Sequence, residues 1–277
     1  MNMMAGFLQT DRRVKGEAHS KAPAAPVSKV RRGYWYWLSY LRSVVFTNNL
    51  IFLYTGVLTT ISLLGSVFDA DGHWQHRCDR LWASLILKTS GVRVRVEGLE
   101  NLDPRQTVIF CVNHPSAMDI PILLATLPVE FRFLAKRELF QLPFLGWFLR
   151  RAGHISVERT RPHEAMHSFE EAAAKVRHGT SVALFPEGHR NRRTTAILPF
   201  KSGSFYLAIS AGVPILPITL NGTRHVHEPD TLHVRPGQTE MIIHPPISTL
   251  GLTRADVQAL SDRVRNALLS RFTLAAD

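Results

Sequence analysis

The first strong pattern along the chain is an apolar stretch from Val44 to Phe68 that contains no charged side chain. About 20 apolar residues are enough for a helix that crosses a bilayer, and this stretch is longer. The segment 34–41 just before it is dense in Tyr and Trp, which favour the boundary between lipid and water. We therefore expect a membrane-associated helix; the alternative is a helix in a protein core. Threonine, asparagine and glycine within the stretch leave open a shallow or re-entrant insertion instead of a full crossing.

A second helical pattern follows between residues 79 and 88, where one apolar stripe contains Leu81, Trp82, Leu85 and Ile86. Residues 34–90 are thus predicted to form a membrane-associated helical hairpin. Residues 1–33 are polar and small, so we expect a basic, mobile arm there, without the apolar core of a cleavable secretory signal. Eight basic and two acidic residues in the segment 1–42 predict, by the positive-inside tendency, the cytoplasmic face of a membrane. In a bacterium this would be the inner membrane.

From residue 92 onward, short apolar runs alternate with helical patterns, which predicts an α/β domain over residues 91–277. We expect a mixed sheet flanked by helices. Strands are expected at 92–96, 107–112, 131–134, 154–157, 180–185, 215–220, 232–234 and 241–244. Helices are expected at 120–127, around Leu145 and Trp147, from Pro162 to about Gly179, and at 253–272. Ligands of such sheets bind beyond the carboxyl ends of the strands, so the residues directly after the strands are the candidates for chemistry.

Two of these strand exits combine residues that can perform acid–base chemistry and bind anions. Residues 113–119 read NHPSAMD, and residues 185–190 read FPEGHR. His114 precedes Asp119 by five positions, so the two side chains meet only if His114 lies before the regular helix begins. In that arrangement the Asp119 carboxylate accepts a hydrogen bond from one imidazole nitrogen, and the other nitrogen is a base for a hydroxyl proton. A histidine near an aspartate is usually inert, so this interpretation depends on the neighbouring motifs.

Four motifs in the same order resemble the glycerolipid acyltransferase family, typified by the 1-acyl-sn-glycerol-3-phosphate acyltransferases. NHPSAMD matches the family's His-x4-Asp block, and FPEGHR matches its third block. The sequence GHISVER at 153–159 resembles the second block, and a proline-flanked apolar strand at 213–218 resembles the fourth. Together the motifs extend over nearly half of the chain. Glu158, His189 and Asn191 depart from the family pattern, and these departures concern the acceptor rather than the reaction type.

The resemblance implies transfer of an acyl chain from an acyl thioester, on CoA or acyl carrier protein, to the free hydroxyl of lysophosphatidic acid. The product would be phosphatidic acid, in phospholipid biosynthesis. The catalytic pair would be His114 and Asp119, with no covalent acyl-enzyme. Arginine forks bind phosphate with two hydrogen bonds, and Glu187 could accept from the glycerol hydroxyl or hold an arginine. The implied substrate-binding residues are Lys136, Arg159, Glu187, Gly188 and Arg190.

The same resemblance implies no metal and no organic cofactor, so the expected partners are the lyso-lipid acceptor, the thioester donor and membrane lipid. Other readings of the chain remain open at this point. The acceptor could be a different lyso-lipid, for example a lyso-amino-acid lipid. The protein could also bind lipid without catalysing a reaction.

Two further motifs are set aside on physical grounds. Residues 163–167 read HEAMH and match the HExxH form of zinc proteases, but the helical pattern places His167 on the polar side of its helix. Cys111 could act as a thiolate nucleophile near His114, but a cysteine within a strand is usually a small buried apolar residue. The chain contains one other cysteine, Cys78, so at most one disulfide could form.

Composition and charge narrow the classes of partner. A hydrophobic content of 45% excludes a disordered chain. The net charge is +11, from 33 Lys and Arg against 22 Asp and Glu, and the segment 1–42 carries +6 of it. The rest of the chain is therefore only mildly basic, and it contains no recognised nucleic-acid-binding motif. We expect no nucleic-acid partner.

Overall fold

The computed structural model describes residues 33–69, 71–158, 162–191 and 196–273, and side chains within the segment 162–166 are not described. The described residues belong to one compact unit, Arg32–Asp277. The basic arm predicted for residues 1–33 lies outside the described residues, except for Gly33.

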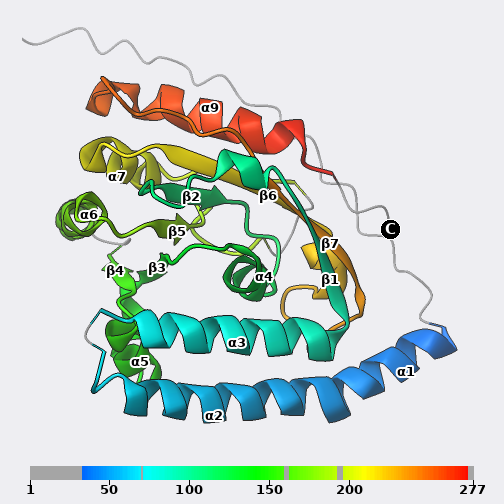
Figure 1. Cartoon of the computed structure of the whole chain (residues 1–277). Helices are drawn as coiled ribbons and strands as arrows, with labels where there is room; N and C mark the ends of the chain where they lie inside the picture. Colours follow the sequence, from blue (N-terminus) through cyan, green and yellow to red (C-terminus); the bar gives the residue numbers. More distant parts are fainter. Residues whose placement is uncertain (1–32, 70, 159–161, 192–195, 274–277) are drawn as a thin grey trace, which may run out of the picture. The chain divides into compact units, whose positions relative to one another are not determined.

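A seven-stranded sheet forms the centre of this unit, in the order β1-β7-β6-β2-β5-β3-β4 (Figure 1). Neighbouring strands are parallel except for β6 and β7, which are antiparallel. The prediction of a mixed α/β sheet is therefore confirmed. The strands within the described ranges are β1 Val92–Glu97, β2 Ile109–Val112, β3 Arg132–Lys136, β4 Ile155–Val157, β5 Val182–Leu184, β6 Ile215–Asn221 and β7 Gly237–Ile243.

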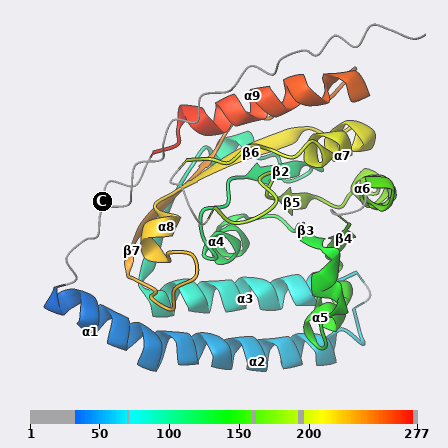
Figure 2. The same cartoon turned by 180° about the vertical axis from the view of Figure 1, so that it is seen from behind.

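Helices cover both faces of the sheet because the central strands are apolar on both sides. In β2, Phe110 and Val112 pack into one core cluster, whereas Ile109 and Cys111 pack into the other. The first cluster is covered by α3 His73–Ser90 and α4 Asp119–Thr126. The second is covered by α6 Pro162–Arg177, α7 Gly203–Ala211 and α9 Val257–Ser270 (Figures 1 and 2).

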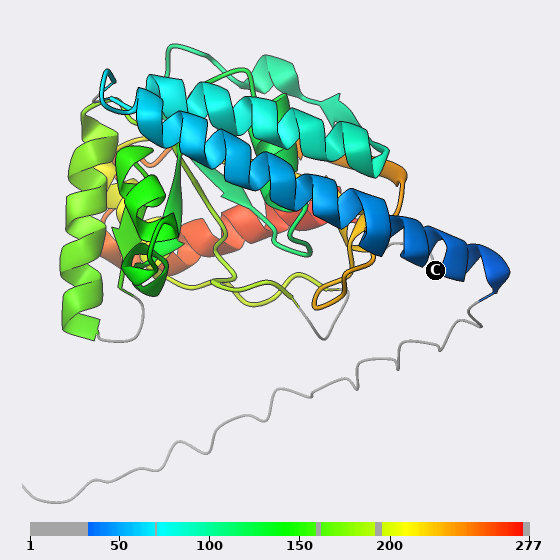
Figure 3. The same cartoon turned by 90° about the horizontal axis from the view of Figure 1, so that it is seen from below.

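The N-terminal part of the unit is a helical hairpin, as the sequence predicts. The first arm consists of α1 Tyr34–Arg42, a π-helical turn Ser43–Thr47 and α2 Asn48–Gly65, which follow one another without a break. By length and composition this arm could cross a membrane. α3 forms the second arm and lies between α2 and the sheet (Figures 1 and 3). A Cβ at Gly65 would lie 2.0 Å from the Trp74 indole nitrogen, so the close approach of the two arms at their turn requires glycine.

Several polar residues of α2 form hydrogen bonds within the protein, and the outer surface of the helix is largely apolar. Thr55 accepts a hydrogen bond from the Trp82 indole of α3 at 2.9 Å, and the hydroxyls of Tyr54 and Thr89 are 3.3 Å apart. The short helix α5 Leu145–Arg151 packs beside α2 and extends the apolar surface. Large exposed apolar side chains on the first helical arm, on α5 and on the loop before α5 include Phe46, Phe52, Leu53, Leu64, Phe144 and Trp147. This surface has the chemistry of a lipid-facing one.

The strand predicted at 232–234 is wrong. This segment forms a single β-bridge, between His227 and Val234, and it packs against the first helical arm instead. Ser43 Oγ donates to the Leu232 carbonyl at 2.7 Å and accepts from the Val234 N–H at 2.8 Å. Sequence periodicity also misses α7 and the short helix α8 Thr223–Val226.

Candidate active site

The residues after β2 form a turn that brings His114 to Asp119. Because α4 begins at Asp119, residues 115–118 lie outside the regular helix, as the five-residue spacing requires. His114 Nδ1 lies 2.7 Å from Asp119 Oδ2, which also accepts the Ser116 N–H at 2.9 Å. Asp119 is fully buried, and no described residue bonds its other oxygen, Oδ1. A carboxylate in this position keeps the proton on Nδ1, so Nε2 is the atom able to accept a proton.

The His114 ring rests on an aromatic stack. Its centroid is 3.8 Å from that of Phe185, directly after β5, and the two planes differ by 13°. Phe133 of β3 continues the stack at 6.3 Å from Phe185. One face of the imidazole is thus shielded from water, and the ring has little freedom to rotate away from Asp119.

Glu187 connects the two loops of the site. Its Oε1 accepts the backbone N–H of His114 at 2.7 Å, and its Oε2 accepts that of Leu198 at 2.9 Å. The side chain is 2% exposed, and this burial raises its pKa, while the two backbone hydrogen bonds act in the opposite direction. One oxygen therefore holds the backbone of the His114 loop, and the other holds the backbone at Leu198. The predicted contact of Glu187 with the acceptor hydroxyl stays a prediction.

Gly188 forms the turn of the FPEGHR loop at a φ of 78°. A Cβ there would lie 2.7 Å from Lys201 Cε. The backbone conformation and the close lysine both favour glycine. This places the Lys201 side chain directly against the loop that follows β5.

Two of the three predicted cationic residues, Arg190 and Lys136, lie at the same edge of the sheet, in different surroundings. Arg190 is half-buried, directly before Asn191, whose N–H donates to the His114 carbonyl at 3.1 Å. Lys136, at the end of β3, is half-exposed and pairs with Glu138 at 2.7 Å. Arg159 lies outside the described residues. The structure thus brings His114, Asp119, Glu187, Gly188 and Arg190 together.

His227 is a neighbour of the site that sequence reasoning missed. Its carbonyl accepts from Ser116 Oγ at 2.7 Å, and its Nε2 donates to the Thr231 carbonyl at 3.0 Å. Burial lowers the pKa of His227, the hydrogen bond to Thr231 opposes this, and the charge of nearby Arg190 lowers the pKa further. His227 belongs to an irregular loop without a motif, so no local sequence signal could have identified it.

His154, in the second motif, is buried and has a structural role. Its Nδ1 accepts the Phe133 N–H at 3.1 Å, and burial lowers its pKa from 6.5 to about 3. The imidazole is therefore neutral in the folded protein, whereas in the unfolded chain it takes up a proton below about pH 6.5. Its contribution to stability is fully present above that pH and is lost progressively as the pH falls toward 3.

We expect this one group to reduce the free energy of unfolding by about 2 kcal/mol at pH 5 relative to pH 7.5. His154→Asn keeps an acceptor for the Phe133 N–H but cannot take up the proton. The melting temperature of this variant should therefore fall less between pH 7.5 and pH 5 than that of the unmodified protein. Thermal unfolding in detergent at both pH values measures the difference. Equal falls in the two proteins would assign the acid sensitivity to other groups.

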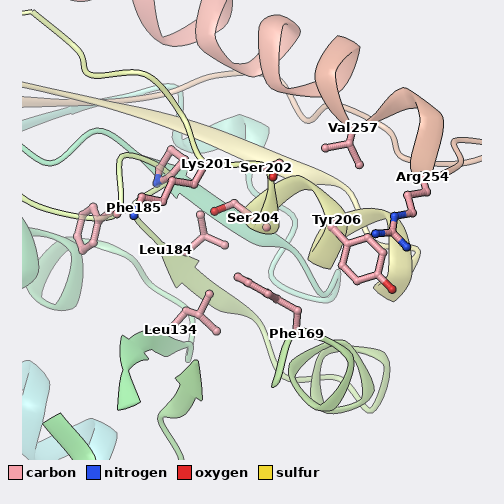
Figure 4. Close-up of a pocket in the computed structure, with 13 residues that line it drawn as sticks. Leu134, Phe169, Leu184, Phe185, Lys201, Ser202, Ser204, Tyr206, Arg254 and Val257 are labelled. Carbon is pink, nitrogen blue, oxygen red and sulfur yellow. The ribbon is translucent and has the colours of Figure 1, made fainter. Parts of the chain in front are cut away.

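A cavity of about 350 Å³ opens beside the FPEGHR loop (Figure 4). Its apolar part is formed by Leu134, Phe169, Leu184 and Val257. Phe185 and Lys201 lie at one end and Tyr206 and Arg254 at the other (Figure 4), and Pro186 and Gly188 of the FPEGHR loop also line the cavity. Phe185 lines the cavity and its ring also stacks on that of His114, which is not among the described lining residues.

Neither the described part of the HEAMH motif at 163–167 nor Cys111 lies in a setting that favours the chemistry considered for it from the sequence. His167 is exposed and lies 3.4 Å from Glu171, whereas the side chains of His163 and Glu164 lie outside the described residues. Among the residues whose placement is described, no group of three His, Cys, Asp or Glu side chains could hold a metal ion. Cys78 and Cys111 are both free and buried, and burial raises the pKa of the Cys111 thiol.

Each of three comparisons with known proteins finds acyltransferases. The profile of the Acyltransferase family matches residues 93–221. Human 1-acyl-sn-glycerol-3-phosphate acyltransferase alpha is 36% identical over 183 residues, which cover 66% of this chain and 64% of the human protein. The chain thus spans slightly less than two thirds of that relative's length.

A bacterial relative and a solved structure are similar over more of their length. The 1-acyl-sn-glycerol-3-phosphate acyltransferase of Borreliella burgdorferi is 31% identical over 192 residues, which cover 69% of this chain and 76% of the relative. The crystal structure of the Thermotoga maritima 1-acyl-sn-glycerophosphate acyltransferase matches with a TM-score of 0.66 at 26% identity. That match covers 85% of this chain and 99% of the Thermotoga chain.

Proposed function

Because this chain belongs to the 1-acyl-sn-glycerol-3-phosphate acyltransferase family, we propose that it acylates the free hydroxyl of lysophosphatidic acid to give phosphatidic acid. The observation that carries the proposal is the His114–Asp119 pair. Its Nδ1–H is held by a buried carboxylate at 2.7 Å, and Nε2 lies at the carboxyl edge of the sheet. This is the geometry of a general base for an alcohol.

In the proposed reaction, His114 Nε2 removes the proton as the lysophosphatidate oxygen attacks the thioester carbonyl carbon. The new carbon–oxygen bond forms and the carbon–sulfur bond breaks. The proton then passes from the imidazolium to the departing thiolate. Asp119 stabilises the imidazolium, so no covalent acyl-enzyme is required.

Arg190 supports a phosphate-bearing acceptor. It is half-buried beside the His114 loop, and a guanidinium binds a phosphate with two parallel hydrogen bonds. Arg159 and Lys136 are proposed as further phosphate ligands, and Lys136 would exchange its exposed pair with Glu138 for the lipid. The donor is an acyl thioester on CoA or on acyl carrier protein, and we propose no metal or organic cofactor.

The long apolar helix supports a position at a membrane, where a lyso-lipid resides. The basic residues at the start of the chain support the cytoplasmic face. The hairpin would then hold the α/β domain at the water–lipid boundary, with the sheet edge in reach of the acceptor hydroxyl.

The test is an acceptor panel with detergent-purified protein. Labelled acyl-CoA or acyl carrier protein is incubated with lysophosphatidic acid, with other lysophospholipids and with lyso-lipids that lack phosphate, and the products are identified. We expect phosphatidic acid as the main product. Preferential acylation of a phosphate-free lyso-amino-acid lipid would overturn the acceptor, and lipid binding without turnover would overturn the enzymatic proposal.

A further inference from the structure

The turn after β2 is tied to the irregular loop that follows α8. Ser116 of this turn is fully buried, and its Oγ donates to the His227 carbonyl at 2.7 Å. The same Oγ accepts the Met118 N–H at 3.2 Å, and the Ser116 N–H donates to Asp119 Oδ2 at 2.9 Å. A shift of Ser116 therefore moves a hydrogen-bond donor of the carboxylate that orients His114.

The first half of the loop 227–235 is folded on itself. His227 Nε2 donates to the Thr231 carbonyl at 3.0 Å, and Thr231 Oγ1 donates to the Glu228 carbonyl at 2.9 Å. His227 also forms a β-bridge with Val234, in the second half of the loop. Because this bridge joins the two halves, a displacement of Val234 also displaces His227.

The second half of the loop is held by the N-terminal helical arm (Figures 2 and 3). Ser43, at the start of the π-helical turn, is fully buried, and its Oγ donates to the Leu232 carbonyl at 2.7 Å and accepts the Val234 N–H at 2.8 Å. Arg42 donates to the Val234 carbonyl at 3.1 Å. Asn48 donates to the Leu232 carbonyl at 2.8 Å. The arm thus supplies partners for backbone groups that a strand would pair within a sheet.

Aromatic contacts extend this connection along α1. The His233 ring centre lies 4.8 Å from that of Tyr36 and 5.5 Å from that of Tyr40, edge-on in both cases. His233 Nε2 also lies 3.0 Å from Ser39 Oγ. Trp35 of the same helix is 78% exposed, and tryptophan favours the boundary between lipid and water. The loop is therefore attached to the helix that would lie at that boundary.

We propose that the N-terminal arm positions the His114–Asp119 pair through the loop 227–235, with Ser43 and Ser116 as the positioning residues at the two ends of the connection. The inference rests on the proposed acyl transfer and gives the arm a role beyond membrane association. Ser43 holds the loop, the loop holds Ser116, and Ser116 holds the carboxylate that orients the base. A misplacement of about 1 Å can cost a reaction about a hundredfold in rate, so small shifts of the turn matter.

Ser43→Ala tests the proposal, with Ser66→Ala as the matched control. Ser66 follows α2, is also buried, and donates to the Leu63 carbonyl at 2.6 Å, within the same arm. We expect Ser43→Ala to lower kcat by roughly five- to tenfold and Ser66→Ala to keep the normal rate. Initial rates of phosphatidic acid formation at saturating substrates measure this. Binding to anionic phospholipid vesicles should be unchanged in both variants, so lost membrane association does not explain the lower rate.

Ser116→Ala removes the other end of the connection and completes a double-mutant cycle. We expect it to lower kcat by about tenfold or more. The variant that combines Ser43→Ala with Ser116→Ala should lose no more than Ser116→Ala alone, because the loop then has nothing to transmit. Two serines that supported the fold independently would instead give losses that multiply. Melting temperatures verify that each variant is folded.

Hydrogen–deuterium exchange of the peptides that cover 113–119 and 227–235 gives a readout that needs no substrate. In Ser43→Ala we expect faster exchange in both peptides and unchanged exchange in β6, whereas Ser66→Ala should exchange like the unmodified protein. Faster exchange confined to 227–235, a normal rate in folded Ser43→Ala, or losses that multiply in the double variant would each overturn the proposal.

Exchange also separates this inference from the proposed function. Faster exchange of both peptides in Ser43→Ala, in a protein that acylates no lyso-lipid, would retain the connection between arm and turn and overturn the function. Conversely, phosphatidic acid formed at equal rates by Ser43→Ala and the unmodified protein would retain the function and overturn the positioning role.

Discussion

Replacing His114 with alanine is expected to lower kcat by about 10³-fold or more, because it removes the only group in the site placed to take the acceptor proton among the described residues. A positioned base contributes on the order of 10² to 10⁴ in rate. The KM values should change little, since the proposed phosphate contacts of Arg190 remain. Initial rates of phosphatidic acid formation with saturating donor measure the effect.

The control for His114→Ala is His167→Ala. His167 is exposed on α6, far from the turn after β2 in sequence, and belongs to the HEAMH motif. We expect full activity from it. Loss of activity in His167→Ala together with bound zinc would restore the metalloprotease-like interpretation, whereas near-normal turnover in a folded His114→Ala would refute the assigned base.

The parts of the site that sequence predicts are those fixed by local geometry. A histidine, a turn and an aspartate within seven residues are close wherever the helix starts late, and here α4 starts at Asp119. The alternation of apolar runs also places both motifs at strand ends, and the parallel pairing of β2 with β5 brings those ends side by side. The spacing in the sequence therefore predicts that His114 lies next to Asp119. The rule that ligands bind beyond the carboxyl ends of the strands predicts that the FPEGHR loop lies beside this pair.

The parts that sequence misses depend on contacts between distant residues. Leu232 and Val234 have the apolar character of a strand, but Ser43, about 190 positions earlier, takes their backbone hydrogen bonds. Glu187 looks like a ligand group in the sequence, yet its oxygens are occupied by the N–H groups of His114 and Leu198. No local pattern contains this information, because each partner belongs to a different element.

The cavity beside the FPEGHR loop shows the same limit. Its walls come from β3, β5, α6, α7 and the start of α9, so its lining is assembled only when those elements pack. α7 itself is not recognised from its short run, and with it Ser204 and Tyr206 are missed as lining residues. Motif comparison therefore identifies the residues at the reacting centre, but the residues that line the surrounding cavity are known only from the tertiary structure.

Asp119→Asn is expected to lower kcat by about 10²- to 10⁴-fold while the protein stays folded. The carboxylate oxygen Oδ2 accepts two N–H groups, from His114 Nδ1 and from Ser116. An asparagine NH₂ group at that position would donate toward both, which favours the His114 tautomer with its proton on Nε2 and removes the base. If the amide turns its oxygen to that position instead, its NH₂ group is buried where Oδ1 has no described partner, and the negative charge that stabilises the imidazolium is still lost.

The matched control for Asp119→Asn is Asp103→Asn, because Asp103 is exposed and its carboxylate accepts, from the described residues, only the Arg105 N–H, which an asparagine oxygen can also accept. Single-turnover acyl transfer with saturating donor and lysophosphatidic acid separates the chemical step from product release, and thermal unfolding verifies the fold of each variant. We expect the loss in kcat with unchanged KM values in Asp119→Asn, and normal kinetics in Asp103→Asn. A folded Asp119→Asn protein that retained more than about a third of the rate would show that the carboxylate does not set the protonation of His114, since a tautomer shift of this kind costs far more than threefold.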